Sequence, residues 1–314
     1  MELIRGLHNL RERHRGCVLS IGNFDGFHLG HQALVTRLKQ HAARVKLPAV
    51  IQIFEPTPRE FFVPSSAPGR INSLRGKLRA LSQAGVDRVH CLRFGQQLSA
   101  WPAERYIEDM LVAKLGVKAV LVGDDFRFGA GRGGDISLLQ RMGEKHGFVA
   151  EAMSTVEISG MRASSSAVRD ALAASDLEKA AQLLGRPYRY LGRVRRGLQL
   201  GRKLNMPTAN IVFKRRPALR MGIYAVRARI DNGAPQNGVA NLGVRPTLGG
   251  TPCLLETHVF GASGDWYGKE MEVEFARFLR PEAKFDSLDA LAAQMHKDSQ
   301  DAQAHFDRLS ANGN

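Results

Sequence analysis

Residues 22–31 read GNFDGFHLGH, and these ten residues indicate the architecture of the first half of the chain. They follow directly on an apolar run, Val18 to Gly22, which predicts a buried strand, and a helical pattern begins at about Gly30. In a strand-to-helix turn, the backbone N–H groups and the positive end of the helix dipole face a bound anion. The stretch therefore predicts a phosphate site at the start of a helix.

Two histidines, His28 and His31, lie on either side of Gly30 in this turn. Imidazole N–H groups placed there can donate hydrogen bonds to the charge that develops when a phosphoanhydride breaks, without a covalent nucleophile. The alternative is a pair of buried core histidines or a metal-binding pair. The glycine-rich turn favours the phosphate site, because packing alone does not require that arrangement.

Strand-like runs and helical patterns alternate through the first half, which is typical of a parallel sheet covered by helices on both faces. The predicted strands are Val18 to Gly22, Ala49 to Phe54, Arg88 to Leu92, Ala119 to Val122 and Phe148 to Ala152. Helical spacing is found in three sets of residues: Leu34, Val35, Leu38, Ala42 and Val45; Leu74, Leu78 and Leu81; and Ile107, Met110, Leu111 and Leu115. These patterns predict an α/β, Rossmann-like domain that two short helices close at about residues 164–185.

The second half has short runs rich in Val, Ile and Tyr, interrupted by Gly, Pro and Asn, which predict an antiparallel β-barrel. The predicted strands are Tyr190 to Arg195, Ile223 to Ile230, Gly238 to Leu242, Leu254 to Phe260 and Met271 to Arg277. A long terminal helix is predicted from about Ser287 to Leu309. Its expected buried residues are Leu288, Leu291, Ala292, Met295 and Phe306.

The length and composition agree with two soluble domains, for which we predict the ranges 1–184 and 185–314. A chain of 314 residues is long for one domain, and 44% hydrophobic with 24% charged residues excludes disordered, collagen-like and coiled-coil classes. No apolar run approaches the ~20 residues that span a membrane, and residues 1–15 lack the apolar stretch of a signal peptide. We therefore expect a cytoplasmic protein with no membrane partner.

The cysteines limit the kinds of site that the chain can contain, and the net charge indicates the kind of partner. Cys17, Cys91 and Cys253 are odd in number and far apart, which excludes a disulfide framework and a thiolate metal cluster. The net charge of +15 favours anionic partners. From Arg186 to Ile230 there are 13 basic residues and no acidic one, so the basicity is local. It indicates either a phosphate-handling site or solvated strand faces.

Two further motifs of the first half follow predicted strands. Residues 123–129 read GDDFRFG at the carboxyl edge of the sheet, where open parallel sheets bind ligands. Phe126 and Phe128 suit either stacking on a planar ligand ring or core packing, and Asp124 and Asp125 suit either ribose or metal contacts or a stable turn.

Residues 164–169 read SSSAVR at the start of a predicted helix. Ser164 and Ser165 can cap the helix or hold phosphate oxygens, and Arg169, one turn on, adds a permanent charge. An ordinary capped helix is the alternative interpretation.

In the second half, residues 197–210 read GLQLGRKLNMPTAN and are dense in glycine and basic residues. Glycines let the backbone approach a polyphosphate, and Arg202 or Lys203 can balance its charge, although a basic hairpin tip has the same composition. Thr208 and Asn210 alternate with Ala209 in an extended segment, so their oxygens are expected to point the same way. Such hard oxygen ligands suit Mg²⁺.

The HLGH motif of the first half resembles the signature of the nucleotidylyl transferase superfamily, which binds ATP phosphates during attack on the α-phosphate. Residues 54–62 (FEPTPREFF), 123–129 and 164–169 resemble its bacterial FAD synthetase branch, which normally occurs fused to riboflavin kinase. The resemblance implies that His28 and His31 are catalytic. The nucleotide- and flavin-binding candidates in this half are Gly22, Asn23, Phe24, Gly30, Asp125, Phe126, Phe128, Ser164, Ser165 and Arg169.

The second half resembles riboflavin kinase, whose Mg-ATP site contains the element seen here as PTAN at residues 207–210. Residues 222–226, 238–247 and 255–258 follow the family pattern in order. The resemblance implies that Thr208 and Asn210 hold Mg²⁺ and that Glu256 takes the proton of the ribityl 5′-hydroxyl. If the resemblance is set aside, the alternative interpretation is that Glu256 is an ordinary exposed carboxylate on a strand. Further binding candidates are Gly201, Arg202, Lys203, Asn241 and Arg245.

The chain is thus expected to be a bifunctional enzyme that phosphorylates riboflavin to FMN and adenylylates FMN to FAD, with ATP, riboflavin and FMN as its small-molecule partners. We expect no nucleic-acid partner and a monomer or weak homo-oligomer. Two alternatives remain at this point: an adenylyltransferase for another mononucleotide, and an RNA-binding protein with a degenerate nucleotide fold. Against RNA binding, the sequence lacks strands that combine aromatic and basic residues, the pattern on which nucleic-acid bases stack.

Overall fold

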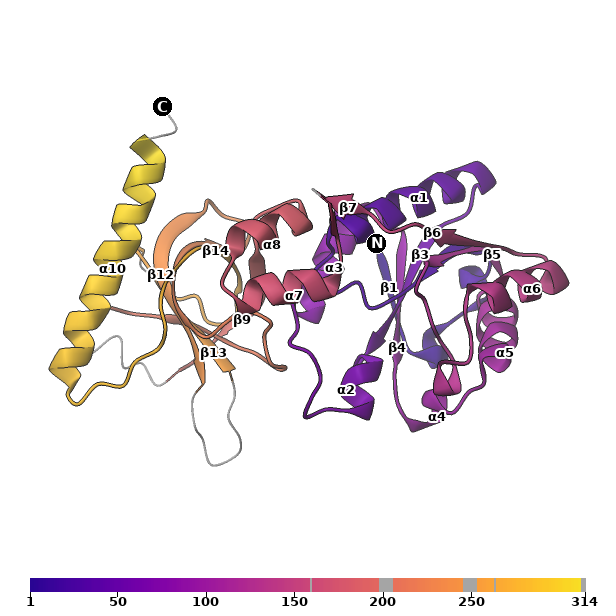
Figure 1. Cartoon of the computed structure of the whole chain (residues 1–314), viewed down its shortest axis with the longest axis horizontal. Helices are drawn as coiled ribbons and strands as arrows, with labels where there is room; N and C mark the ends of the chain where they lie inside the picture. Colours follow the sequence, from indigo (N-terminus) through magenta and orange to yellow (C-terminus); the bar gives the residue numbers. More distant parts are fainter. Residues whose placement is uncertain (159, 198–205, 245–252, 263, 312–314) are drawn as a thin grey trace. The chain divides into compact units, whose positions relative to one another are not determined.

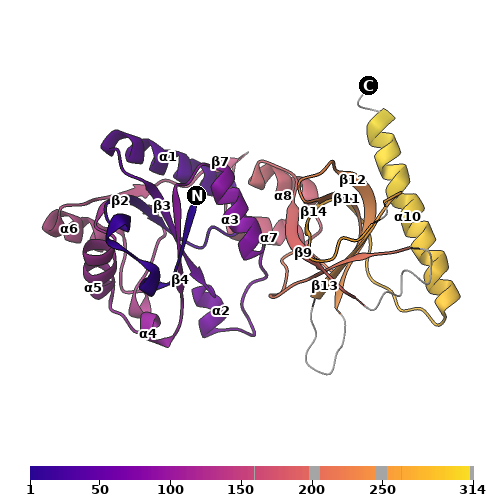
Figure 2. The same cartoon turned by 180° about the vertical axis from the view of Figure 1, so that it is seen from behind.

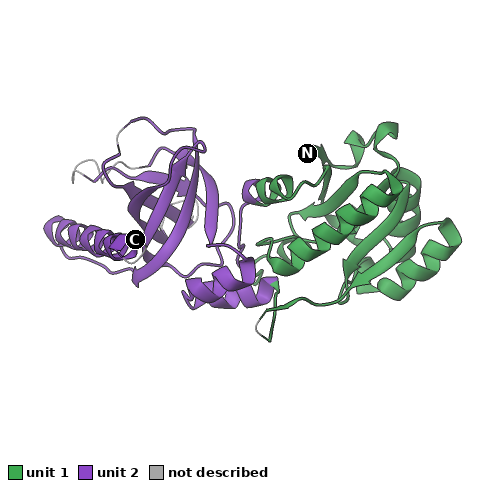
Figure 3. Cartoon of the chain, turned by 90° about the horizontal axis from the view of Figure 1, so that it is seen from above, with its two compact units in different colours: residues 1–68, 77–164 green, residues 69–76, 165–314 purple. Residues whose placement is uncertain are grey.

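The computed structural model describes residues 1–311, except 159, 198–205, 245–252 and 263 (Figures 1 and 2). The chain divides into two compact units (Figure 3). Unit 1 comprises Met1–Pro68 and Lys77–Ser164, and unit 2 comprises Gly69–Gly76 and Ser165–Asn314. The division of function at residues 184 and 185 stays a prediction.

Unit 1 is built on a parallel sheet of six strands in the order β1-β4-β3-β2-β5-β6. The strands are β1 (Glu2–Arg5), β2 (Cys17–Ile21), β3 (Ala49–Glu55), β4 (Arg88–Arg93), β5 (Val117–Gly123) and β6 (Val149–Met153). The five predicted strands are confirmed, and β1 is an additional strand at the edge. Because β3 and β5 lie on opposite sides of β2, the strand order reverses at the carboxyl end of β2, where open sheets of this kind bind ligands.

Helices cover the sheet of unit 1. Its helical segments are α1 (Leu29–Val45), α2 (Pro58–Phe62), α3 (Leu74–Gln83, whose first residues belong to unit 2), α4 (Gln96–Ser99), α5 (Ala103–Arg105), the π-helical η3 (Tyr106–Lys114) and α6 (Ile136–His146). Shorter elements are the 3-10 turns η1 (Leu7–Asn9), η2 (Glu12–His14) and η4 (Ala130–Arg132) and the small hairpin β7 (Glu157–Ile158) and β8 (Met161–Arg162).

Both faces of the central strand β2 are buried, as predicted. Leu19 and Ile21 pack in a cluster with residues of η3 and α6. Side chains alternate along a strand, so Val18 and Ser20 face the other way, and both are fully buried there. Helix α1 packs against β2, β3 and β5. Its predicted apolar residues Leu34, Val35, Leu38 and Ala42 are buried, whereas Val45 in the last turn is exposed.

A chain of buried polar side chains crosses the core of unit 1. Gln52 on β3 bonds to His90 Nδ1 at 3.0 Å, and His90 Nε2 faces the Gly6 carbonyl at 3.3 Å. The Tyr106 hydroxyl donates to Gln52 Oε1. A carbonyl can only accept, so His90 carries its proton on Nε2 and accepts from the Gln52 amide. Burial lowers the pKa of His90 to about 4, against the opposing effect of the Gly6 hydrogen bond.

Unit 1 is therefore expected to lose stability as the pH falls below the ordinary histidine pKa of 6.5. The unfolded chain takes up a proton on His90 there, whereas the folded chain does so only near pH 4. Between about pH 7.5 and 5, His90 should lower the free energy of unfolding by about 2 kcal/mol. Urea unfolding can be followed by the fluorescence of Trp101 in a Trp266→Phe background. His90→Gln should flatten the pH dependence, and equal slopes for both proteins would contradict the assignment.

Unit 2 contains a closed antiparallel barrel in the order β10-β13-β12-β11-β14-β9. The strands are β9 (Arg189–Arg195), β10 (Ala209–Val212), β11 (Gly222–Ile230), β12 (Gln236–Val244), β13 (Cys253–Val259) and β14 (Glu270–Arg280). They confirm the predicted barrel, and β10 contains the predicted extended segment around Asn210. The two predicted short helices are α7 (Ser165–Ala173) and α8 (Leu177–Leu184), with Asp176 capping α8 through the Lys179 N–H.

The segment 69–76 is part of unit 2 although it lies early in the sequence. The Tyr188 hydroxyl donates to the Ile71 carbonyl at 2.8 Å, and Ser73 Oγ donates to the Leu191 carbonyl at 2.7 Å. These bonds explain why the segment clusters with the barrel rather than with its sequence neighbours.

The long helix α10 (Leu288–Ala311) packs against β11, β12 and β14 (Figure 1). Ala302 and Phe306 are buried against the barrel, but Leu288 is 68% exposed, so its predicted burial was wrong. Asp298 is the third buried residue of α10. It forms a bidentate ion pair with Arg280 on β14, in which Arg280 Nε and Nη2 donate to the two carboxylate oxygens at 2.7 and 2.6 Å. The helix is thus held to the barrel by a charged pair as well as by apolar packing. Within the described residues, no helix is both long and apolar enough to span a membrane.

Candidate active sites

The turn after β2 has an unusual backbone. Phe24, Gly26 and Phe27 all have positive φ, at 47°, 83° and 48°. Bulky residues rarely adopt this conformation, and such strain is concentrated at functional loops. The turn therefore has a shape that packing alone does not require.

The two histidines of the turn lie against each other at the start of α1. The rings of His28 and His31 stack with centroids 3.8 Å apart, and the Phe24 ring lies 4.8 Å from His31. His28 occupies the N-cap position and is 6% exposed, and Phe24 is fully buried. The structure thus brings His28 and His31 together at the positive end of a helix, and Phe24 packs against them.

Two glycines, Gly22 at the start of the turn and Gly30 between the histidines, lie where a side chain would be crowded. A Cβ at Gly30 would lie 2.9 Å from the Ala163 carbonyl oxygen and 3.1 Å from the His28 ring. A Cβ at Gly22 would lie 3.2 Å from the Phe24 ring. The Ala163 carbonyl, and with it the start of the Ser164 residue that follows, therefore lies beside the histidine turn. The part of Ser164 in a nucleotide site stays a prediction. Asn23 lies in the same turn.

The loop after β5 lies next to this turn in the sheet, because β2 pairs with β5. Asp125 is exposed and forms an ion pair with Arg162 at 2.7 Å, and Asp124 accepts from Thr155 at 3.1 Å. Phe126 and Phe128 stack with centroids 5.4 Å apart and pack partly buried against the core. Both interpretations of these rings, core packing and ligand stacking, agree with a partly buried pair.

Ser165 and Arg169 lie in α7, within unit 2. Arg169 Nε donates to the Gly69 carbonyl at 2.8 Å in that unit. Their part in the nucleotide site stays a prediction.

A row of polar side chains crosses the outer face of the barrel. Asn210 on β10 lies opposite Glu256 on β13, and Glu256 lies opposite Asn241 on β12. Residues directly opposite each other in antiparallel strands point to the same face, with Cβ atoms about 5 Å apart. Three predicted site residues from three strands are therefore neighbours.

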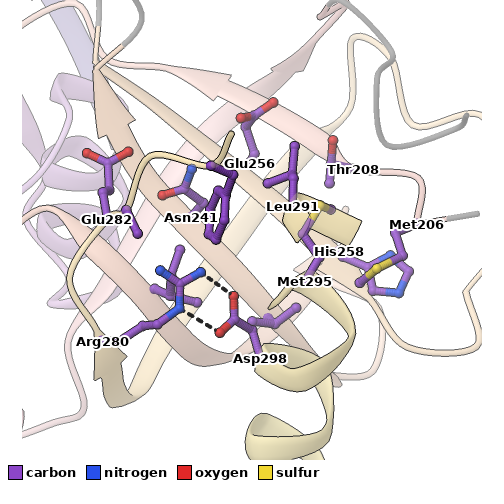
Figure 4. Close-up of a pocket in the computed structure, with 14 residues that line it drawn as sticks. Met206, Thr208, Asn241, Glu256, His258, Arg280, Glu282, Leu291, Met295 and Asp298 are labelled. Atoms are coloured by element: carbon purple, nitrogen blue, oxygen red, sulfur yellow. Dashed lines mark hydrogen bonds and ion pairs between the residues drawn. The ribbon is translucent and has the colours of Figure 1, made fainter. Parts of the chain in front are cut away.

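A cavity of about 210 Å³ lies over Glu256 and Asn241, between the barrel and α10 (Figure 4); Asn210 is not among its lining residues. Polar atoms of Thr208, Asn241 and Glu256 enter it from the barrel. Its apolar lining residues are Met206, Ile223, Val239, Ala283, Phe285, Leu291 and Met295. The remaining lining residues, His258, Arg280, Glu282 and Asp298, are polar or charged. A cavity with apolar walls and several polar groups suits a flat aromatic ligand carrying hydroxyl groups.

A second cavity of about 440 Å³ adjoins the first, and Thr208 lines both. Its other lining residues include Pro207, Ala209, Asp265, Trp266 and Tyr267. Two ligands could therefore meet at Thr208, one from each cavity. This geometry fits a group transfer between bound substrates.

Two amide oxygens in the row lack a hydrogen-bond partner within the described part of the chain. Asn210 Oδ1 and Asn241 Oδ1 are both buried, on either side of Glu256. Buried polar atoms are nearly always paired, so each oxygen has the capacity to accept from, or bind to, a ligand or ion. Asn210 is 4% exposed, and a Cβ at Gly197 would lie 2.8 Å from its side-chain amide. Asn210 Oδ1 is a hard oxygen of the kind that Mg²⁺ prefers.

Sequence reasoning missed Glu282, a second carboxylate that lines the first cavity (Figure 4). Burial raises its pKa above the ordinary value and the charge of Glu256 adds to this, whereas hydrogen bonding to Asn241 acts the other way. Glu282 follows β14 in a stretch with no motif, so no sequence signal pointed to it. Gly201, Arg202, Lys203 and Arg245, by contrast, were predicted but lie outside the described residues.

Comparisons with known proteins agree with both halves of the chain. A family model described as FAD synthetase matches residues 10–167, and one described as riboflavin kinase matches residues 184–306. A protein of Pseudomonas fluorescens named bifunctional riboflavin kinase/FMN adenylyltransferase is 48% identical over 305 residues, which cover 97% of each chain. The protein of that name from Escherichia coli K12 is 45% identical over 307 residues, 98% of each chain.

Solved structures resemble the chain as well, and one of them does so over nearly its whole length. The crystal structure of a macrolide-efflux protein from Streptococcus pneumoniae has a TM-score of 0.77 and 26% identity, and the match covers 95% of this chain and 97% of that one. The combination of a parallel α/β domain and a barrel with a terminal helix therefore occurs in another protein.

Proposed function

The chain belongs to the family of bifunctional riboflavin kinase/FMN adenylyltransferases, and from this premise we propose that it converts riboflavin to FMN and FMN to FAD, using ATP in both steps. The observation that carries the proposal is the cavity lined by Glu256 and Asn241, which shares Thr208 with a second cavity. Asn210 lies opposite Glu256 on the neighbouring strand. The alternatives, RNA binding and another dinucleotide, are not favoured, since both halves match flavin-nucleotide families.

In the kinase step, riboflavin occupies the first cavity and ATP the second. Glu256 accepts the proton of the ribityl 5′-hydroxyl while that oxygen attacks the γ-phosphorus and ADP leaves. Positioning contributes most in such transfers, because there is little covalent chemistry for the protein to do. Because Thr208 lines both cavities, riboflavin and ATP bound in them would lie on either side of the Thr208 side chain.

Thr208 and Asn210 are the residues that would hold Mg²⁺, and the buried Asn210 Oδ1 without a partner among the described residues fits this role. Bound Mg²⁺ neutralises the phosphate charge that builds up during transfer. No group of three or more His, Cys, Asp or Glu side chains suited to a metal occurs among the described residues. A site with few protein ligands is nevertheless usual for Mg²⁺ held with nucleotide phosphates.

In the adenylyl step, a phosphate oxygen of FMN attacks the α-phosphorus of ATP and pyrophosphate leaves. His28 and His31, stacked at the start of α1, donate hydrogen bonds to the charge that develops on the phosphates. The N-terminal N–H groups of α1 add to this stabilisation. Asn23 and Ser164 lie in and beside the same turn and complete the proposed phosphate contacts.

The proposed location is the cytoplasm, in agreement with the free thiols of Cys17, Cys91 and Cys253. The proposed partners are the small molecules ATP, riboflavin and FMN, with no nucleic acid. We further propose a monomer or weak homo-oligomer.

A time course with purified chain, riboflavin, ATP and Mg²⁺ tests the proposal. Chromatography should show FMN rising first and FAD following, with one ADP per flavin phosphorylated and one pyrophosphate per FAD. Nicotinamide mononucleotide in place of FMN should give no dinucleotide. A steeply salt-dependent affinity for RNA without ATP turnover would instead support the RNA-binding alternative.

A further inference from the structure

The segment that carries Thr208 needs support beyond the strand ladder. The pairing of β10 with β13 ends at Ala209 and Thr257, so Pro207 and Thr208 lie past the last paired residue. Proline has no N–H to donate. Backbone pairing therefore leaves the position of Thr208 unfixed, although two cavities meet at this residue.

Two side chains bond to the backbone of this segment: Asn210 Nδ2 donates to the Thr208 carbonyl at 3.2 Å, and His258 bonds to Pro207 from another strand. His258 Nδ1 lies 2.9 Å from the Pro207 carbonyl oxygen, across 51 residues of sequence. A carbonyl only accepts, so Nδ1 carries the proton in both the neutral and the charged ring. The His258 ring also packs edge-to-face with the Phe260 ring, with the two ring centroids 5.8 Å apart.

His258 also lies on the strand that carries Glu256. The two residues are two apart on β13, and alternation places both side chains on the outer face, where both line the first cavity (Figure 4). The hydrogen bond from His258 to Pro207 thus connects the segment that carries Thr208 to β13, the strand that carries the proposed base Glu256.

We infer that His258 is a positioning residue for riboflavin phosphorylation, holding the Pro207–Asn210 segment in register with Glu256. The inference rests on the proposed function. It does not place His258 in contact with the reacting atoms. Without the bond, the segment that binds the phosphoryl donor shifts relative to the acceptor, and misplacement by about 1 Å costs on the order of 10²-fold in rate.

The test compares His258→Ala with His258→Asn, because the asparagine amide can occupy the place of Nδ1 and donate to the same carbonyl. His258→Ala should lower kcat for riboflavin phosphorylation by roughly 10- to 100-fold and raise the KM for Mg-ATP. His258→Asn should recover most of the loss. Its pH–rate profile should match the wild type, because asparagine keeps the donor and cannot titrate.

The adenylylation of added FMN is the control for intact protein, since the histidine turn of unit 1 is unchanged. Wild-type rates in His258→Ala, or an asparagine variant as impaired as the alanine one, would overturn the inference. The inference would also be overturned if the pH–rate profile of His258→Asn lost one of its two limbs, because that loss would indicate that His258 itself transfers a proton. A wild-type chain that fails to phosphorylate riboflavin overturns the proposed function, and this inference with it.

Discussion

Glu256→Gln is expected to lower riboflavin phosphorylation by about 10²- to 10⁴-fold, the range typical for loss of a general base. Glutamine keeps the size and hydrogen bonding of the side chain but cannot take the proton of the 5′-hydroxyl. With riboflavin as substrate, neither FMN nor FAD should accumulate. With added FMN, FAD should form at the wild-type rate. Chromatography of the flavins from both substrates measures the two activities separately.

Glu272→Gln is the matched control for this substitution. Glu272 is a carboxylate of the same barrel, on β14, and it forms a long ion pair with Arg189 at 3.8 Å outside both cavities. Its replacement should leave both activities within about 2-fold of the wild type, since such partly exposed pairs contribute little. Normal phosphorylation by Glu256→Gln would show that Glu256 is not the base, and Glu282 would be the next carboxylate to test.

The local features of the fold were predictable from the sequence because each depends on neighbouring residues. The run 18–22 followed by GNFDGFHLGH predicted β2 and the start of α1, and the structure has them at Cys17–Ile21 and Leu29. The edge strand β1 escaped prediction because its four residues, Glu2–Arg5, include two charges and too few positions to show alternation.

The residues proposed for the kinase site could be named from the sequence, but their geometry could not. Glu256, Asn210 and Asn241 were each identified by resemblance, yet only strand register makes them neighbours, and register is fixed by pairing between distant segments. Glu282 lies in no motif and enters the cavity only because α10 and the segment before it fold back over the barrel. The exposure of Leu288 has the same origin, since periodicity marks a helix face but not where its contact with the barrel begins.

His28→Ala is expected to stop the chain at FMN, lowering FMN adenylylation by about 10²- to 10³-fold, as found when one donor to a developing charge is removed. Riboflavin phosphorylation should be unchanged, so FMN should accumulate in place of FAD. Because the rings of His28 and His31 stack at 3.8 Å, the double variant should lose much less than the product of the two single losses.

His41→Ala separates loss of chemistry from damage to α1. His41 lies on the same helix, pairs with Glu151 at 3.0 Å and is distant in sequence from the turn, so adenylylation should stay within about 2-fold of the wild type. His28→Gln, which retains a donor, should fall between His28→Ala and the wild type. Full FAD synthesis by His28→Ala would show that His28 is not required and would leave His31 and the N–H groups of the turn as the donors. Equal losses in His28→Ala and His41→Ala would instead indicate that the substitutions act through the stability of α1.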